Sequence, residues 1–141
     1  IPENVLAVIK ELFETKEDGR IKLFLIHRLL HMRRQHDAFF TYAEYVPLTV
    51  EGAKKDCVVA FARRRGEQWG GIVVPRLLTK IIQAGELPLG RSCWGDTRLL
   101  VPKEMPGTMV DGITSQRIEI KKTVHLGTLF TCFPGAVLTM T

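Results

Sequence analysis

The sequence lacks any apolar run that approaches the roughly 20 residues a helix needs to cross a bilayer. Its first residues, IPENVLAVIKELFETK, contain acidic residues and no cleavage site, so they do not resemble a signal peptide. We therefore expect no membrane segment and a cytoplasmic location. The first residue is not Met, and we interpret the chain as a fragment of a longer protein.

Cysteine is scarce, with three residues that lie far apart at Cys57, Cys93 and Cys132. No two of them have the spacing of metal ligands, and three cysteines cannot all pair within one chain. This pattern predicts free thiols in a reducing cytoplasm.

Charge is not concentrated, although the net charge is +5. Residues 1–36 hold seven Lys or Arg and five Asp or Glu, and residues 37–141 hold thirteen and ten. The one basic cluster, Arg63–Arg65, precedes Gly66 and reads as a solvated turn. A nucleic-acid-binding domain needs a concentrated basic patch, so we expect no nucleic-acid partner.

What is present is enough apolar sequence, 45% of 141 residues, for one folded domain with a core. Apolar residues recur at helical spacing from Pro2 to about Lys16. The pair Asp18-Gly19 should end this helix, and Asp18 can cap the next one. That second helix is predicted over 20–35, with an apolar arc so wide that two helices alone cannot bury it.

After Phe40 the pattern changes to short β-branched runs separated by turn residues. Residues 57–64 and 70–76 should form a hairpin, and Pro75 limits the second strand to an edge or an end. Residues 77–83 read as a short helix or a loop. Further strands are predicted in DTRLLVP, TMVDGI, RIEIKK and AVLTMT. The expected fold class is therefore α+β: two N-terminal helices, then an antiparallel β-sandwich of six to eight strands.

Three groups of side chains could carry chemistry, and each has a more ordinary interpretation. His27 and His31 have zinc-ligand spacing on one helical face, but no third ligand is evident, so a solvated or docking face is favoured. Cys57 could be a nucleophile with a histidine, yet it opens an apolar strand as a buried thiol would. Asp96 and Asp111 could be a general acid and base, but both lie in Gly-Asp or Asp-Gly turns, where the carboxylate commonly bonds the backbone.

Trp94 could be a platform on which a sugar ring stacks, or a large core residue whose indole N–H finds a partner. We expect the second, with Gly95-Asp96 forming a turn into the next strand and the Asp96 carboxylate accepting nearby hydrogen bonds. A self-standing carbohydrate-binding module would show two or three exposed aromatics in line. The sequence holds two Trp and two Tyr, and Tyr42 and Tyr45 precede the sheet rather than share a face with Trp94.

Several segments together resemble the C-terminal end of the maltooligosyltrehalose synthase family, within the α-amylase superfamily. The resemblance covers about residues 18–138 and is carried, in order, by DGRIKLFLIHRLLHMRRQHDAFF, YVPLTVEG, VVAFARR, VVPRLL, WGDTRLLVP and FPGAVL. VVAFARR and WGDTRLLVP are fairly specific to the family. The helix LLHMRRQHDAFF, residues 29–40, is less so, since the last barrel helix of many amylase relatives looks similar.

This resemblance implies that residues 1–38 are the terminal helices of a catalytic (β/α)₈ barrel and that residues 39–141 are a C-terminal antiparallel β domain. The parent enzyme would be an isomerase that converts the reducing-end α-1,4 linkage of a maltooligosaccharide into an α,α-1,1 linkage by retaining intramolecular transglucosylation. That chemistry needs two carboxyl groups about 5 Å apart. They would lie on barrel strands that this sequence does not contain. The resemblance therefore assigns no catalytic, cofactor-binding or metal-binding residue here, and it implies two partners: the catalytic barrel and, through it, the maltooligosaccharide.

Overall fold

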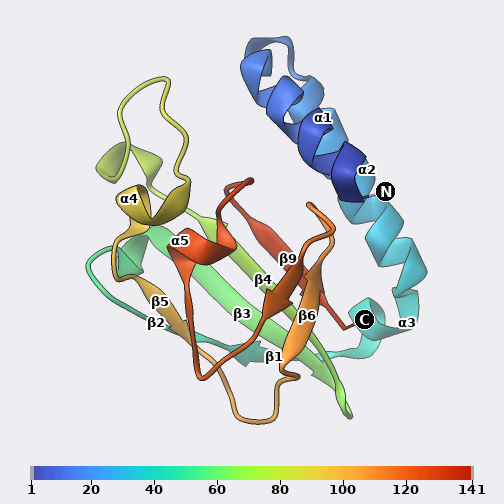
Figure 1. The fold of residues 1–141 in the computed structure, drawn as a ribbon. Coiled ribbons are helices and arrows are strands. Elements are labelled where there is room, and N and C mark those ends of the chain that lie inside the picture. The colour runs from blue at the N-terminus through green and yellow to red at the C-terminus, as the bar shows by residue number, and fades with distance from the viewer. Residues whose placement is uncertain (1, 141) are drawn as a thin grey trace.

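The computed structural model describes residues 2–140, which form two packed β-sheets and a helical hairpin (Figure 1). The hairpin consists of α1 (Pro2–Glu14), the 3₁₀ turn η1 (Lys16–Asp18) and α2 (Arg20–Gln35). The predicted bounds of the second helix are confirmed. Gly19, with a left-handed φ of 80°, is the N-cap of α2, so Asp18 is not the capping residue. Asp18 instead accepts the backbone N–H of Arg20 over 2.9 Å, as in an Asx turn.

A short helix that the sequence did not predict, α3 (Asp37–Tyr42), follows α2 and contains the boundary expected at residue 38. Phe39 of α3 lies over Gly70, where a Cβ would come within 2.8 Å of the Phe39 ring. The sheet residue beneath α3 must therefore be small, because the aromatic ring occupies the space of a side chain.

The larger sheet has six antiparallel strands in the order β1 (Glu44–Pro47), β3 (Val58–Arg65), β4 (Gln68–Pro75), β9 (Ala136–Thr139), β6 (Thr108–Asp111) and β7 (Arg117–Glu119). The predicted β3–β4 hairpin is confirmed, with Gly66 and Glu67 at its turn. Pro75 is the last residue of β4, the end position that its missing N–H requires.

The smaller sheet has three antiparallel strands in the order β2 (Thr49–Glu51), β5 (Arg98–Leu100) and β8 (Thr123–His125). The described residues thus hold nine strands, one more than the upper end of the predicted range. Between strands lie η2 (Lys55–Cys57), η3 (Leu78–Lys80), α4 (Gly90–Trp94) and α5 (Leu126–Leu129). The fold is α+β with an antiparallel two-sheet sandwich, as expected.

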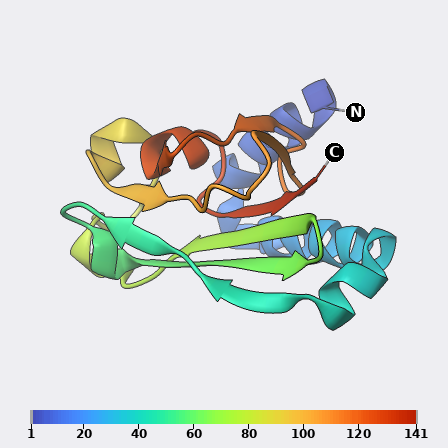
Figure 2. The ribbon, with the colours of Figure 1, turned by 90° about the horizontal axis from the view of Figure 1, so that it is seen from below.

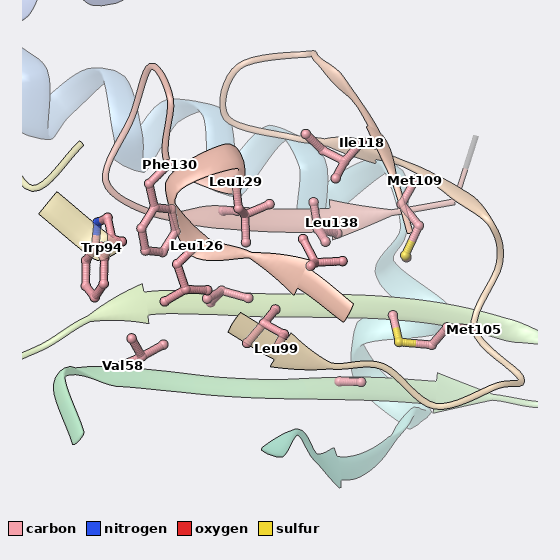
Figure 3. Close-up of a cluster of buried hydrophobic side chains, with 14 of the residues drawn as sticks. Val58, Trp94, Leu99, Met105, Met109, Ile118, Leu126, Leu129, Phe130 and Leu138 are labelled. Carbon is pink, nitrogen blue, oxygen red and sulfur yellow. The ribbon is translucent and has the colours of Figure 1, made fainter. Parts of the chain in front are cut away.

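Two hydrophobic clusters hold these layers together. The first lies between the two sheets and includes Ala62, Trp94, Leu99, Met109 and Phe130 (Figure 3). The second lies between the other face of the large sheet and the helical hairpin; it includes Val5, Ile9, Met32, Ile113, Phe133 and Val137. The large sheet is therefore covered on both faces along β4 and β9, which are its central strands.

Candidate functional site

Trp94 ends α4 and is buried, with 1% of its surface exposed. Its indole N–H donates to the carbonyl oxygen of Pro88 over 2.8 Å. Its ring meets Phe130 edge to face, with centroids 5.4 Å apart (Figure 3). The interpretation of Trp94 as a core residue is confirmed, because a ring enclosed in this way cannot stack on a sugar.

The turn after Trp94 differs in detail from the prediction. Gly95 has a φ of 56°, and the Thr97 N–H donates to the Trp94 carbonyl over 3.0 Å, which directs the chain into β5 as expected. The prediction for Asp96 is wrong. Its side chain is 70% exposed, and among residues 2–140 its carboxylate has no ion pair shorter than the 4.0 Å that separates it from the Arg98 guanidinium. Backbone groups close this turn, so the carboxylate is free to point into water.

Thr97 fills the buried role that the sequence suggested for Asp96. It is 0% exposed, and its hydroxyl oxygen accepts the backbone N–H of Lys54 over 3.2 Å. The alternation of the strand TRLL, with Leu99 also buried, was the signal that could have placed Thr97 inside.

Asp111, at the end of β6, is 1% exposed. Its carboxylate links the β6–β7 turn to β9 through hydrogen bonds. One carboxylate oxygen accepts the N–H of Ile113 over 3.0 Å and that of Val137 over 3.3 Å. The other accepts the Thr114 hydroxyl over 3.0 Å. Burial raises the pKa of Asp111, outweighing these hydrogen bonds and the charge of Arg28, which lower it. The interpretation of Asp111 as a turn residue that bonds the backbone is confirmed.

The structure does not bring Asp96 and Asp111 together as an acid–base pair. Asp111 lies buried in the large sheet, whereas Asp96 lies exposed beside the small sheet. The two carboxylates have different surroundings and share no hydrogen-bond partner among residues 2–140.

Arg28 connects α2 to the β6–β7 turn, a contact that sequence reasoning missed. Its Nε donates to the Gly112 carbonyl over 3.2 Å and its Nη2 to the Ser115 hydroxyl over 2.5 Å. Ser115 itself adopts a left-handed φ of 63°. A groove of about 640 Å³ with a mixed polar and apolar lining opens beside this contact, between α2, the turn and the end of β9, and Arg28, His31 and Gln35 line its helical side.

His27 and His31 are exposed and stack, with ring centroids 6.3 Å apart. Within the described part of the chain, no three His, Cys, Asp or Glu side chains gather closely enough to hold a metal ion.

The three cysteines are free thiols. Cys57 is buried, as its apolar context predicted, and burial raises the pKa of the Cys93 thiol.

One flank of α2 is apolar and open. Leu23, Ile26 and Leu30 are 68%, 44% and 63% exposed, while Leu25, Leu29 and Met32 of the same helix pack into the second cluster. The sequence indicated an apolar arc too wide for two helices to bury, and this flank is the part that remains uncovered.

Two exposed tyrosines follow the C-terminal end of α2, one in α3 and one in β1. Tyr42 and Tyr45 are 71% and 64% exposed. The Tyr45 ring lies 5.0 Å from that of Phe61, and the Arg65 guanidinium lies 5.2 Å from the centre of Tyr42. Both tryptophans are buried, so neither adds an exposed indole ring to the surface that carries these tyrosines.

No helix among residues 2–140 combines the length and apolar character that a membrane span requires. Comparison with known proteins gives no match to the chain among protein-family models, curated proteins or solved structures.

Proposed function

We propose that this chain is the C-terminal, non-catalytic part of a cytoplasmic isomerase that converts the reducing-end α-1,4 linkage of maltooligosaccharides into an α,α-1,1 linkage. The proposal begins with the ordered resemblance of six segments to the maltooligosyltrehalose synthase family. Its partners are the catalytic barrel of the same parent protein and the maltooligosaccharide that the barrel binds. Residues 1–38 belong with the barrel, and residues 39–141 form the C-terminal β domain.

The observation that carries the proposal is the open flank of α2. A helix that exposes Leu23 and Leu30 by more than 60% each is stable in water only at a cost in free energy. A further layer of protein on this flank, as the outer helices of a barrel have, would remove that cost. The order of elements, helices before an antiparallel sandwich, also agrees with the resemblance.

The connection between the helices limits what this chain contributes to a barrel. The chain passes from α1 to α2 through η1 and Gly19, with no strand between them. In a (β/α)₈ barrel the catalytic groups lie at the ends of strands. The hairpin therefore adds to the outer helical layer, and the two carboxyl groups of the retaining reaction come from elsewhere in the parent enzyme.

The segments that carry the resemblance supply core side chains rather than a reactive site. Three of these side chains are each at most 3% exposed: Ala62 of VVAFARR, and Trp94 and Leu99 of WGDTRLLVP. All three pack in the cluster between the sheets. Buried apolar side chains stabilise a fold and do not contact a substrate, which suits a supporting domain.

The alternative is a self-standing carbohydrate-binding β-sandwich. Tyr42 and Tyr45 are the observation in its favour, since exposed aromatic rings can stack on sugars. Against it, the rings engage Arg65 and Phe61 respectively, and neither tryptophan is accessible. Retention on an amylose column that is lost in the double variant Tyr42→Ala, Tyr45→Ala would favour this alternative.

The proposal is tested with the gene and with maltopentaose. We expect the coding sequence before Ile1 to encode barrel strands with paired acidic residues. The full-length protein should convert maltopentaose into a non-reducing product, whereas the purified 141-residue chain should not. An upstream sequence without such a barrel, or activity that follows the purified chain, would contradict the proposal.

A further inference from the structure

The groove beside the Arg28 contact has one wall from α2 and one from the sheet. Residues that share one face of the helix form the first wall: Arg28, His31, Met32, Gln35 and His36. Residues 110–112, Ser115 and residues 139–140 at the end of β9 form the second. Figure 2 shows β9, in red, ending beside the helical hairpin. We name this site the α2–turn groove.

The α2–turn groove lies on the opposite face of α2 from the open apolar flank. At about 100° per residue, Leu23 and Leu30 lie about 160–180° round the helix from Met32. His31 and Gln35 lie within about 100° of Met32. A protein layer that covered Leu23 and Leu30 would therefore cover the face of the helix that the groove does not use.

Three hydrogen-bond donors line the part of the groove where α2 meets the turn. Arg28 is fixed there, because its Nε donates to the Gly112 carbonyl and its Nη2 to the Ser115 hydroxyl. Among residues 2–140, neither Nη1 of Arg28 nor the O–H of Ser115 has an acceptor. His31, one helical turn after Arg28, adds an exposed imidazole. A guanidinium held in place with free N–H groups is suited to binding an oxyanion.

The charges around these donors also favour an anion. α2 contains five Lys or Arg and no Asp or Glu. Asp111 is the one acidic side chain among the described residues that line the groove. Its two carboxylate oxygens already accept three hydrogen bonds from the turn and from β9. Arg28 and His31 precede the last turn of α2, to which the negative end of the helix dipole is confined.

The rest of the groove has room for an organic group that carries hydroxyls. A volume of about 640 Å³ lies in the range of small-molecule sites. Gln35, His36 and Thr139 supply an amide, an imidazole and a hydroxyl to its lining, and these groups can donate to hydroxyls or accept from them. Met32 and Met140 supply apolar contact between these polar groups.

We propose that the α2–turn groove binds a small phosphate monoester with a hydroxylated organic part, of the sugar phosphate class. A phosphate monoester presents three acceptor oxygens and a charge near −2, which match Arg28, Ser115 and His31. The organic part then extends toward Gln35 and Thr139. This inference goes beyond the proposed function and does not rest on it, since the groove lies within residues 2–140 and needs no catalytic barrel.

The test titrates the isotope-labelled 141-residue chain with three probes and follows its backbone amides by NMR. The probes are glucose 6-phosphate, inorganic phosphate and glucose. With glucose 6-phosphate we expect saturable shifts at residues 28–36 and 111–116. Inorganic phosphate should bind at least tenfold more weakly, because it makes no contact in the rest of the groove, and glucose should give no saturable shift. Equal binding of glucose 6-phosphate and either other probe, or no binding of glucose 6-phosphate, would overturn the proposal.

Two substitutions on neighbouring turns of α2 separate the groove from the general charge of the helix. His27 and His31 are both exposed and their rings stack, but only His31 lines the groove. His31→Glu should weaken binding of glucose 6-phosphate at least tenfold, and His27→Glu at most threefold. Equal losses would assign the binding to unspecific attraction by a basic helix and overturn the proposal.

A third substitution tests the wall opposite the helix. Ser115→Ala removes one of the three donors and should weaken binding of glucose 6-phosphate at least threefold. Thermal unfolding of each variant, measured first, shows that it folds. Loss with His31→Glu but not with Ser115→Ala would mean that the phosphate does not reach the turn, and would overturn the proposal. Because the titration contains no maltooligosaccharide, its failure and failure of the maltopentaose test are separate results.

Discussion

The backbone of Thr97 lies so close to Gly52 that a Cβ atom on Gly52 would come within 2.6 Å of the Thr97 Cα. Gly52 follows β2 and has a φ of 114°, a conformation that side chains rarely allow. This approach joins the turn after β2 to the turn before β5, the two strands that pair in the small sheet.

Gly52→Ala should therefore destabilise the chain by more than 2 kcal/mol, because steric overlap adds to an unfavourable backbone conformation. Gly66→Ala is the matched control. Gly66 also has a positive φ, of 62°, but nothing lies within 4 Å of its Cβ position, so about 1–2 kcal/mol is expected. Urea unfolding of both variants measures the difference, and equal losses would show that the backbone contact is relieved without strain.

Trp94→Ala should lower the free energy of unfolding by about 3–5 kcal/mol, since it empties the space of a buried indole and leaves the Pro88 carbonyl without its donor. The melting temperature should fall, and any retention on amylose should be unchanged. Loss of amylose retention at an unchanged melting temperature would instead make Trp94 a sugar contact.

Asp96→Ala and Thr97→Val should differ although the residues are neighbours. The Asp96 carboxylate is exposed, so its removal should change stability by no more than about 0.5 kcal/mol. Thr97→Val keeps the shape but leaves the Lys54 N–H without its acceptor, at about 1–3 kcal/mol. Calorimetric unfolding measures the stability of both variants. A larger loss of stability for Asp96→Ala than for Thr97→Val would contradict the assignment of Thr97 as the buried hydrogen-bonding residue.

Asp111 should make stability depend on pH. Its pKa in the folded chain is raised by burial above 3.8, its ordinary value, so folding favours the protonated form. The stabilisation that protonated Asp111 gives the folded chain is fully present below about pH 4, the pKa of this carboxyl in the unfolded chain. It is lost as the pH rises through the higher pKa that the carboxyl has in the folded chain. The free energy of unfolding of the wild type, minus that of Asp111→Asn, should therefore decrease as pH rises from about 4. An increase with pH would show that the carboxylate is stabilised in its charged form.

Elements with a long repeat or a strong turn signal were predictable from the sequence. The second helix has the expected bounds, because its apolar residues recur at helical spacing. The β3–β4 hairpin has nearly the expected bounds, because two β-branched runs flank a Gly turn. α4 and α5 were missed. With five and four residues, they are too short for helical periodicity to show, and tertiary contacts such as that of Trp94 with Phe130 fix them.

The candidate site was predictable in its residue types and less so in its contacts. Asp111 and Trp94 followed from local chemistry, a turn carboxylate and a large indole. Asp96 was assigned wrongly, because its Gly-Asp turn was weighed without the alternation of TRLL, which places Thr97 and Leu99 on the buried face and Asp96 outside it. Arg28 was also missed, since its partners Gly112 and Ser115 are more than 80 positions away in the chain.

The position of β9 in the sheet sets the order in which the chain can fold. β9 is the last strand among the described residues, yet it lies between β4 and β6 and is the element through which the two halves of the six-stranded sheet pair. While the chain is being synthesised, β1, β3 and β4 can associate early, but β6 and β7 have no partner on that side until residues 136–139 leave the ribosome. The large sheet therefore completes only after synthesis of this segment, and an exposed edge of β4 persists until then.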